Sequence, residues 1–295
     1  MYVSLFFFIQ LFMLRIAVQS KGRLHDDTMA LFSEINLKTV NNKRTLLMPV
    51  HGFPVEFLFL RDDDIPLTVS SGTADAGIVG YNEIMERGVS VDESIRLGFG
   101  SCRLSLAIPN EVVYTGLKWF KGKRIATSYP KMLGDFLERN HIDAQIHQIT
   151  GSVEISTAIG LADAIFDIVS SGSTLVSNNL KEVEIIEQSQ AVLIANQNLS
   201  EKKKAILEEI IFRIHAVKSA EKMKYVMMNA PRDKLEEILS ILPGIKSPTI
   251  MSLAEKGWCS VHTVIDDSRF WEILGILKNR GAQGILVLPI EKMIL

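Results

Sequence analysis

Short apolar runs alternate with helical stretches along the chain up to residue 196. The runs with strand character lie at residues 14–18, 55–60, 76–80, 104–109, 123–128, 162–169 and 190–196. We expect helices after several of them, for example from Pro66 and Pro130, because proline suits the first turn of a helix. Apolar strands that alternate with helices predict an α/β architecture with largely parallel sheets.

Chain length and the position of two strands predict the domain organisation. At about 150 residues per domain, 295 residues suggest two domains or more. The stretch between the strands at 104–109 and 190–196 has its own α/β pattern, so we interpret it as a domain inserted into the first one, with both strands as a hinge. The prediction is a domain I of residues 14–108 and 193–223 and a domain II of residues 109–192.

The tail of the chain has a different pattern. Beyond residue 223, segments with strand or helix character follow in the order β-α-β-β-α-β. This order is the ferredoxin-like split βαβ arrangement, and it predicts a small separate domain over residues 224–295. Such a domain suits ligand sensing or contacts between subunits better than the main chemistry.

An apolar leader precedes the first expected strand. Residues 2–14 contain no basic residue, no small-x-small cleavage pattern follows them, and the run is shorter than the ~20 residues of a membrane-spanning helix. We therefore expect a cytoplasmic chain in which residues 1–13 stand outside the fold, with Met13 as a candidate start. A signal sequence or an anchor is the alternative.

Charge and cysteine usage exclude some classes of function. Lys and Arg total 32 against 34 Asp and Glu, and the resulting net charge of −2 argues against general nucleic-acid affinity while allowing a local cationic pocket. Cys102 and Cys259 form no CxxC pair, and the six histidines show no metal-ligand spacing. The acidic run 62–64 invites a metal site, but we interpret Asp64 as the cap of the helix that Pro66 opens.

The segment Glu154–Leu175, EISTAIGLADAIFDIVSSGSTL, holds the most informative chemistry. A buried strand leads through Asp167 into a turn of small hydroxyl residues at the start of an expected helix. Backbone N–H groups, hydroxyls and the partial positive charge of a helix N-terminus suit a phosphate, and a glycine permits its close approach. An ordinary capped strand–turn–helix is the alternative on local grounds, and the lack of GK[ST] excludes a Walker A loop.

Positions in this segment and in blocks along the chain match one known family. The matching signature positions are Glu154, Gly160, Ala162, Ile165, Asp167, Ile168, Ser171, Gly172, Thr174 and Leu175. The blocks include LRIAVQSKGRL, LRDDDIP, DAGIVGYN, GSCRLSLAIP, GKRIATSYP, LPGIKSPTI and GILVLPIEKM. From Leu14 onward the chain thus resembles the ATP phosphoribosyltransferase family, in the long form that carries its own regulatory domain.

The resemblance implies a bilobal, periplasmic-binding-protein-like catalytic core of two α/β domains and an ACT-like regulatory domain. It also implies the first reaction of histidine biosynthesis. With Mg²⁺ as cofactor, N1 of the ATP adenine attacks the anomeric carbon of phosphoribosyl pyrophosphate, and N1-(5-phosphoribosyl)-ATP and pyrophosphate form. Because the transition state resembles an oxocarbenium ion, the protein mainly has to position two phosphorylated substrates and neutralise charge.

Candidate site residues follow from residue type and place together with the resemblance. Those for phosphoribosyl pyrophosphate are Glu154, Asp167, Ser170, Ser171, Gly172, Ser173, Thr174 and Leu175. Those for ATP are Asp75, Gly80, Tyr81, Ser128 and Tyr129. The catalytic cations are Lys21, Arg23 and Arg103. A plain surface cation is the alternative at the two loop positions, core packing is the alternative for Tyr129, and the metal ligands stay open.

In the tail, the resemblance implies feedback inhibition by histidine at a subunit interface. The candidate contacts are Asn229, Ser247, Thr249 and Gly284, although turn chemistry alone also explains a serine before a proline. The resemblance further implies inhibition by AMP at the active site, a homo-hexamer in equilibrium with dimers, and no separate regulatory subunit.

Two rival interpretations predict different behaviour. A periplasmic solute receptor also has two α/β lobes joined by two strands behind an apolar leader, and it would bind one small ligand without turnover. A catalytically silent relative would bind both substrates without turnover. The phosphate-type turn and the added tail favour the enzyme over the receptor.

Overall fold

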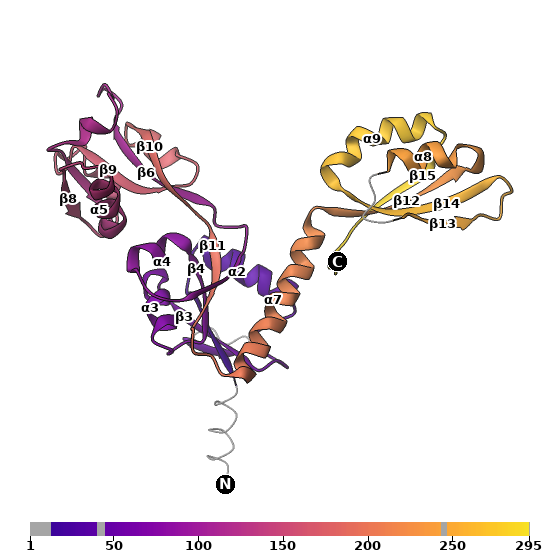
Figure 1. Cartoon of the computed structure of the whole chain (residues 1–295), viewed down its shortest axis with the longest axis horizontal. Coiled ribbons are helices and arrows are strands. Elements are labelled where there is room, and N and C mark those ends of the chain that lie inside the picture. Colours follow the sequence, from indigo (N-terminus) through magenta and orange to yellow (C-terminus); the bar gives the residue numbers. More distant parts are fainter. Residues whose placement is uncertain (1–12, 40–44, 243–246, 295) are drawn as a thin grey trace, which may run out of the picture. The chain divides into compact units, whose positions relative to one another are not determined.

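The computed structural model describes residues 13–39, 45–242 and 247–294. The chain divides into two compact units, residues 1–208 and 209–295. The first unit holds two lobes, each built around its own sheet, and the second unit holds one smaller sheet (Figure 1). The predicted leader lies outside the described residues except for Met13.

The first lobe is a six-stranded sheet with the strand order β2-β3-β1-β4-β11-β5. Its strands are β1 (Leu14–Gln19), β2 (Leu47–Pro49), β3 (Val55–Leu60), β4 (Ala76–Gly80), β5 (Asp92–Arg96) and β11 (Ala191–Ala195). Its helices are α2 (Arg23–Glu34), α3 (Ile65–Ser70) and α4 (Tyr81–Arg87). Strands β1, β3 and β4 run parallel, and their central residues Ile16, Phe57 and Ile78 are fully buried, as expected for apolar runs in a parallel sheet.

The second lobe is a five-stranded sheet with the order β10-β6-β9-β7-β8. Its strands are β6 (Cys102–Pro109), β7 (Arg124–Thr127), β8 (Gln145–Gln148), β9 (Ala164–Val169) and β10 (Leu180–Ser189), and its helices are α5 (Pro130–Arg139) and α6 (Ser173–Ser177). Strands β7, β8 and β9 are parallel, whereas β6 is antiparallel to both β9 and β10. Leu104, Phe120 and Phe166 fill the core of this lobe.

Strand pairing places the boundary between the lobes earlier than expected. β6, predicted as a hinge strand of domain I, lies wholly in the second sheet, and β10, which was not predicted, is its neighbour. The chain crosses between the lobes just before Cys102 and again at Gln190, where the N–H of Ala191 donates to the carbonyl of Phe99 at 3.0 Å. An apolar run predicts a strand but does not say which sheet the strand joins.

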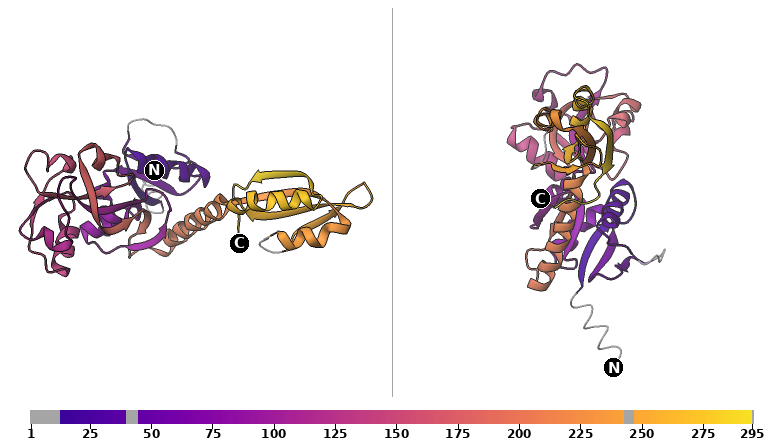
Figure 2. Two further views of the ribbon diagram at one scale, coloured as in Figure 1. Left: turned by 90° about the horizontal axis from the view of Figure 1, so that it is seen from above. Right: turned by 90° about the vertical axis from the view of Figure 1, so that its right-hand side faces the viewer.

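The second unit has the expected βαββαβ order. Its elements are β12 (Met223–Pro231), α8 (Leu235–Ile241), β13 (Thr249–Ser252), β14 (Trp258–Asp266), α9 (Asp267–Asn279) and β15 (Gln283–Pro289). The sheet is antiparallel in the order β13-β14-β12-β15, which is the ferredoxin-like arrangement. Helices α8 and α9 cover one face of it, where Met228 and Val261 are buried with Ile238 and Leu277 (Figure 2).

Helix α7 (Glu201–Glu221) leads from the first unit into the second. The boundary between the units falls inside this helix, after Glu208, whereas the prediction drew it at residue 223. In the described part of the chain, no helix is both long and apolar enough to cross a membrane.

Candidate active site

A cavity of about 240 Å³ lies where strands of both lobes end. Gln19 ends β1, Gly80 ends β4 and Ser170 follows β9, and all three line this cavity. Arg23, the first residue of α2, also lines it. Open α/β sheets bind ligands at the carboxyl ends of their strands. The cavity thus brings together three predicted residues, Arg23, Gly80 and Ser170.

The two predicted loop cations are both exposed. The side chain of Arg23 is 84% exposed, and its Nε lies 3.9 Å from Oδ2 of Asp27 one turn along α2. Lys21 is exposed in the turn between β1 and α2 and does not line the cavity. An exposed cation beside a strand end can meet a polyanionic ligand without first breaking a buried ion pair.

The turn after β9 has the geometry that its sequence suggests. Gly172 has a φ of 82°, a left-handed conformation that favours glycine, and α6 begins at Ser173. The hydroxyls of Ser171 and Ser173 are 2.9 Å apart and share a hydrogen bond. Thr174 is exposed, whereas the side chain of Leu175 is buried in the core. Leu175 can therefore offer a ligand only its backbone.

Arg103, predicted to face the cleft as a catalytic cation, is held in a bidentate ion pair. Its Nε and Nη2 donate to the two carboxylate oxygens of Glu182 on β10, at 2.6 and 2.7 Å. Its remaining nitrogen, Nη1, donates to the carbonyl of Ser170 at 3.0 Å. This pairing lowers the pKa of Glu182. The prediction missed the pair because the sequence does not show that β10 lies beside β6.

Of the two predicted acidic residues of domain II, Asp167 is affected by the charge of Glu154. The pKa of Asp167 is raised to about 6, mainly by burial. The N–H of Ile168, which donates to its carboxylate at 2.8 Å, opposes this rise, and the charge of Glu154 adds to it. Asp167 lies opposite Ser105 in the pairing of β9 with β6. A carboxyl group that titrates near neutrality can accept or donate a hydrogen bond, as a ribose hydroxyl requires.

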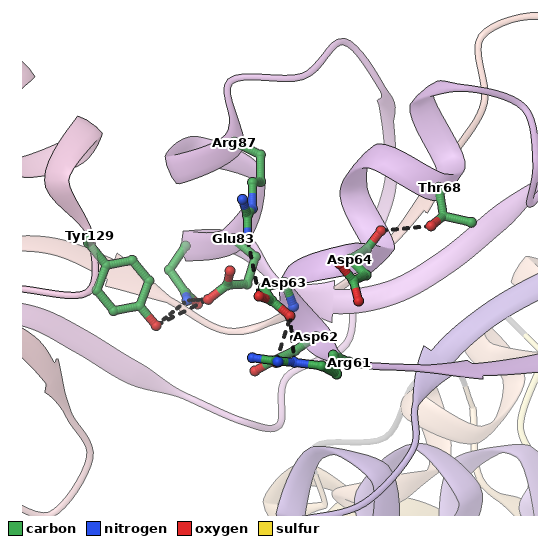
Figure 3. A network of polar contacts seen from close by, with 9 residues as sticks. Arg61, Asp62, Asp63, Asp64, Thr68, Glu83, Arg87 and Tyr129 are labelled. Carbon is green, nitrogen blue, oxygen red and sulfur yellow. Dashed lines mark hydrogen bonds and ion pairs between the residues drawn. The ribbon is translucent and has the colours of Figure 1, made fainter. Parts of the chain in front are cut away.

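A polar network joins the two lobes beside the cavity (Figure 3). The hydroxyl of Tyr129 donates to Glu83 on α4 at 3.1 Å, and the side-chain amide of Asn82 donates to the same carboxylate oxygen at 2.8 Å. Burial, followed by the charge of Asp62, raises the pKa of Glu83 to about 7. Burial also raises the pKa of Tyr129. Tyr129, a candidate for stacking on adenine, therefore has its hydroxyl fixed by the opposite lobe.

A second, larger cavity of about 710 Å³ adjoins this network. Ser128 and Tyr129, both predicted to bind ATP, line it. The hydroxyl of Ser128 donates to the carbonyl of Ile149 at 3.1 Å. Asp62 and Glu83 line both cavities, so the two spaces adjoin at these carboxylates.

The acidic run at 62–64 is only partly a helix cap. Asp64 stands at the N-cap position of α3, but its carboxylate makes no capping bond, and its carbonyl instead accepts the hydroxyl of Thr68 at 2.8 Å. Asp63 forms ion pairs with Arg61 and Arg87, each at 3.2 Å. Among the described residues, no group of three or more His, Cys, Asp or Glu side chains is placed to hold a metal ion.

Asp75 does not belong with the other residues predicted to bind ATP. It precedes β4, whereas Gly80 ends that strand, so the two lie at opposite edges of the sheet. Its carboxylate accepts the N–H of Arg15 at 2.8 Å and pairs with Lys203 at 2.7 Å. Asp75 and Gly80 belong to the same sequence block, but a strand lies between them, and for this reason their shared motif does not place them at one site. Tyr81, which opens α4, lies under the guanidinium of Arg96 at 5.1 Å.

The predicted histidine contacts are only partly brought together. Asn229 of β12 and Gly284 of β15 are neighbours, since a Cβ added to Gly284 would lie 3.4 Å from Nδ2 of Asn229. Thr249 of β13 pairs with His262, so β14 lies between it and β12. Ser247 is exposed and adjoins residues 243–246, which lie outside the described part of the chain.

Sequence comparisons decide the family. A family model described as ATP phosphoribosyltransferase matches residues 61–216, and one described as HisG, C-terminal domain, matches residues 220–292. The ATP phosphoribosyltransferase of Bacteroides thetaiotaomicron is 65% identical over 282 residues, which cover 96% of this chain and all of the relative. The chain belongs to the ATP phosphoribosyltransferase family. A second relative, the ATP phosphoribosyltransferase of Cytophaga hutchinsonii, is 53% identical over 95% of this chain and 98% of its own length.

A solved structure shares the bilobal fold of this ATP phosphoribosyltransferase family member. It is the ATP phosphoribosyl transferase (HisG:HisZ) complex from Thermotoga maritima, with a TM-score of 0.60 and 26% identity over 68% of this chain and 96% of that chain. The members of this family are pentosyltransferases. The family match confirms the resemblance inferred from the sequence. The solute-receptor interpretation is not supported.

Sequence reasoning missed three polar residues of the site. Glu182 lies in a strand that the pattern did not reveal, so no signal pointed to it. Asn82 lies in the block DAGIVGYN and Glu83 directly follows it, but neither was given a role. Their position at the start of a helix after β4, at the ligand-binding edge of the sheet, was the available signal.

Proposed function

We propose that the chain transfers the phosphoribosyl group of phosphoribosyl pyrophosphate to N1 of ATP, with pyrophosphate as the leaving group, in the first step of histidine biosynthesis. The supporting observation is that one cavity at the carboxyl ends of β1, β4 and β9 is lined by Arg23, Gly80 and Ser170. These residues come from three separate blocks of the family resemblance. The rival reading of a silent relative differs from this proposal only in turnover.

The roles of individual residues follow from their surroundings. We assign the 5-phosphate to the turn and helix start at Ser171–Thr174, whose hydroxyls and backbone N–H groups suit an anion. Asp167 would hold the ribose hydroxyls, together with Glu154, whose charge acts on the Asp167 carboxyl group. The exposed cations Lys21 and Arg23 would neutralise the pyrophosphate as its bond to the anomeric carbon lengthens.

The ATP side of the proposal is supported by the two cavities. Gly80 lines the smaller cavity, and Ser128 and Tyr129 line the larger one. Tyr81 follows Gly80 directly and stays a candidate contact for ATP. Asp75 is left out because it lies at the opposite edge of the sheet. AMP, which shares the adenosine part of ATP, would compete at the same place.

The proposal includes a Mg²⁺ requirement, for which the second lobe offers carboxylates. Bound Mg²⁺ would neutralise the phosphate charges of the substrates, and in phosphate sites this ion is commonly held by one or two carboxylates together with the phosphates and water. Asp167 and Glu154 are the candidate carboxylates. A site of this kind needs no dedicated cluster of protein ligands, and the described residues contain none of three or more.

Regulation and assembly complete the proposal. Histidine would inhibit by binding at the second unit near Asn229 and Gly284, with Thr249 and Ser247 contributed across a subunit interface. The expected assembly is a homo-hexamer in equilibrium with dimers that needs no separate regulatory subunit, because residues 220–292 match the C-terminal domain model.

The free thiols Cys102 and Cys259 suit the reducing cytoplasm, where we place the enzyme.

The test is turnover by the purified chain with ATP, phosphoribosyl pyrophosphate and Mg²⁺, with nucleotides separated by chromatography. Product that contains one additional phosphoribosyl group on adenine, and that decreases when histidine is added, supports both the reaction and the regulation. A folded sample that binds both substrates but forms no product would favour the silent relative.

Thr174→Val tests the assignment of the turn. This change removes one exposed hydroxyl without changing the side-chain volume much, so we expect the KM for phosphoribosyl pyrophosphate to rise about tenfold, the loss of one charge-assisted hydrogen bond. Thr115→Val, at an exposed position of the same lobe outside the turn, is the matched control. Equal kinetics in the two variants would remove Thr174 from the site.

A further inference from the structure

Behind the proposed phosphate turn lies a contact made by three strands of the second lobe. Arg103 comes from β6 and Glu182 from β10, which run side by side in the sheet (Figure 1), and Ser170 directly follows β9. Glu182 accepts from Nε and Nη2 of Arg103, and Nη1 donates to the carbonyl of Ser170. The contact therefore ties the first residue of the turn to the two neighbouring strands.

The geometry of this contact leaves Arg103 little freedom. A guanidinium group is planar, so a carboxylate that binds two of its nitrogens also fixes the direction of the third. The hydroxyl of Ser105 donates to the same carboxylate at 2.5 Å, which holds Glu182 in turn. With its plane fixed, Arg103 can place one N–H group on the carbonyl of Ser170 and hold that peptide in one position.

We propose that Glu182 is a positioning residue for phosphoribosyl pyrophosphate, because it clamps Arg103 and thereby fixes the turn that receives the 5-phosphate. The inference rests on the proposed function and adds a residue to it. In this arrangement Arg103 acts on the backbone of the turn and not on the substrate. The catalytic role predicted for Arg103 is thus replaced by a supporting one.

The contact serves the position of the turn as well as the fold. The side chains of Arg103 and Glu182 are only 29% and 24% exposed, so removing one partner also lowers stability, and the positioning role has to be read from constants for ligand binding. A turn binds a phosphate better when its backbone is already held in the binding geometry, because a mobile backbone positions the ligand less precisely.

The same lobe contains a matched control at the other end of β9. Arg124 forms an ion pair with Asp163 in which two of its nitrogens contact the carboxylate, at 3.3 and 3.0 Å, and its Nη1 donates to the carbonyl of Gly160 at 3.0 Å. Asp163 precedes β9, whereas Ser170 follows it, so the two pairs are equivalent in kind and differ in place. All four side chains lie outside the linings of both cavities, but Ser170, the acceptor of Arg103, lines the smaller cavity, whereas Gly160 lines neither.

The experiment compares Glu182→Gln with Asp163→Asn in the full-length chain. Each change replaces a carboxylate by an amide, whose NH₂ group opposes the arginine donors. We expect Glu182→Gln to raise the KM for phosphoribosyl pyrophosphate about tenfold and to weaken binding of ribose 5-phosphate equally, with the KM for ATP changed less than about twofold. Asp163→Asn should leave all three values within about twofold.

A double-mutant cycle tests whether Glu182 acts through Arg103. Arg103→Lys removes the planar group, so adding Glu182→Gln to it should cost no further affinity for ribose 5-phosphate. Additive losses would overturn the proposal, and so would a Glu182→Gln variant that resembles Asp163→Asn in every constant. If the parent chain forms no product, the proposed function fails, while ribose 5-phosphate binding by calorimetry still tests the clamp.

Discussion

The buried carboxyl group of Glu83 has an unusual protonation equilibrium. The residue is 7% exposed, and burial is the main reason that its pKa rises to about 7 from an ordinary value of 4.5. Between these two pH values the folded chain holds a proton that the unfolded chain has released. The folded state therefore loses stability as the pH rises from 4.5 to 7, and above 7 the loss is complete.

Glu83→Gln should remove this dependence on pH. Glutamine keeps an oxygen that can accept from Tyr129 and Asn82, and it never ionises. At pH 8 the variant should be more stable than its parent by as much as about 3 kcal/mol, and near pH 4.5 the two should be alike. Thermal unfolding at both pH values measures this, with exposed Glu138→Gln as the control. A difference that does not change with pH would contradict the raised pKa.

Residue chemistry could be predicted from the sequence where it depends on near neighbours. The strand, the turn of small hydroxyl residues and the helix that follows it are predicted from a local motif, and the structure has β9, this turn and α6 in that order. Asp75 and Arg103 were misjudged because their partners, Lys203 and Glu182, are 128 and 79 residues away along the chain. A charged residue looks free in a sequence until the strand or helix that carries its counter-charge has been placed.

Among the elements, helix α5 receives its N-terminal cap from the other lobe. Tyr129, at its N-cap position, makes no side-chain capping bond. Glu86 of α4 instead accepts the N–H groups of Lys131 and Met132, at 3.0 and 2.9 Å. A carboxylate that satisfies the free N–H groups of a helix is stabilising, and here it also fastens the second lobe to the first.

Glu86→Ala should loosen the first turn of α5. We expect a loss of about 0.5–2 kcal/mol, the range for removal of an N-cap, and faster hydrogen exchange at the amides of Lys131 and Met132. Glu138→Ala, near the end of the same helix and exposed, should change neither. Unchanged protection of the two amides in Glu86→Ala would show that water replaces the carboxylate without cost.

The elements themselves were well predicted except where the pattern was weak. The strands at 55–60 and 76–80 lie where the apolar runs placed them. The sequence does not predict β10, because charged residues such as Glu182 and Glu187 interrupt its apolar positions. Two register shifts in its pairing with β6 also disturb the alternation of its inward and outward side chains. Without β10, the pattern does not show that the strand at 104–109 lies between β10 and β9 in the second sheet, and the strand is therefore interpreted as a hinge of the first domain.

At the scale of the whole molecule, the proposal requires communication between two units. The proposed catalytic residues lie in residues 1–208 and the proposed histidine contacts in residues 209–295. If histidine lowers the affinity for a substrate, that substrate must lower the affinity for histidine by the same factor. Binding of histidine measured with and without phosphoribosyl pyrophosphate therefore reports the coupling directly.

Gly284→Ala should weaken the response to histidine without impairing the reaction. Gly284 has a φ of 57°, and an added Cβ would lie 3.4 Å from Nδ2 of Asn229, so alanine disturbs both the backbone and the candidate contact. The histidine concentration for half-inhibition should rise about tenfold, which corresponds to about 1.4 kcal/mol, and turnover without histidine should stay within about twofold.

Gly275→Ala in α9 is the matched control for this test. An added Cβ there meets no atom within 4 Å, and alanine favours a helix, so histidine sensitivity should be unchanged. If both variants respond to histidine as the parent does, the inhibitor binds away from Gly284. If both lose the response equally, the second unit has been disturbed as a whole, and the pairing of Gly284 with Asn229 has no special part in inhibition.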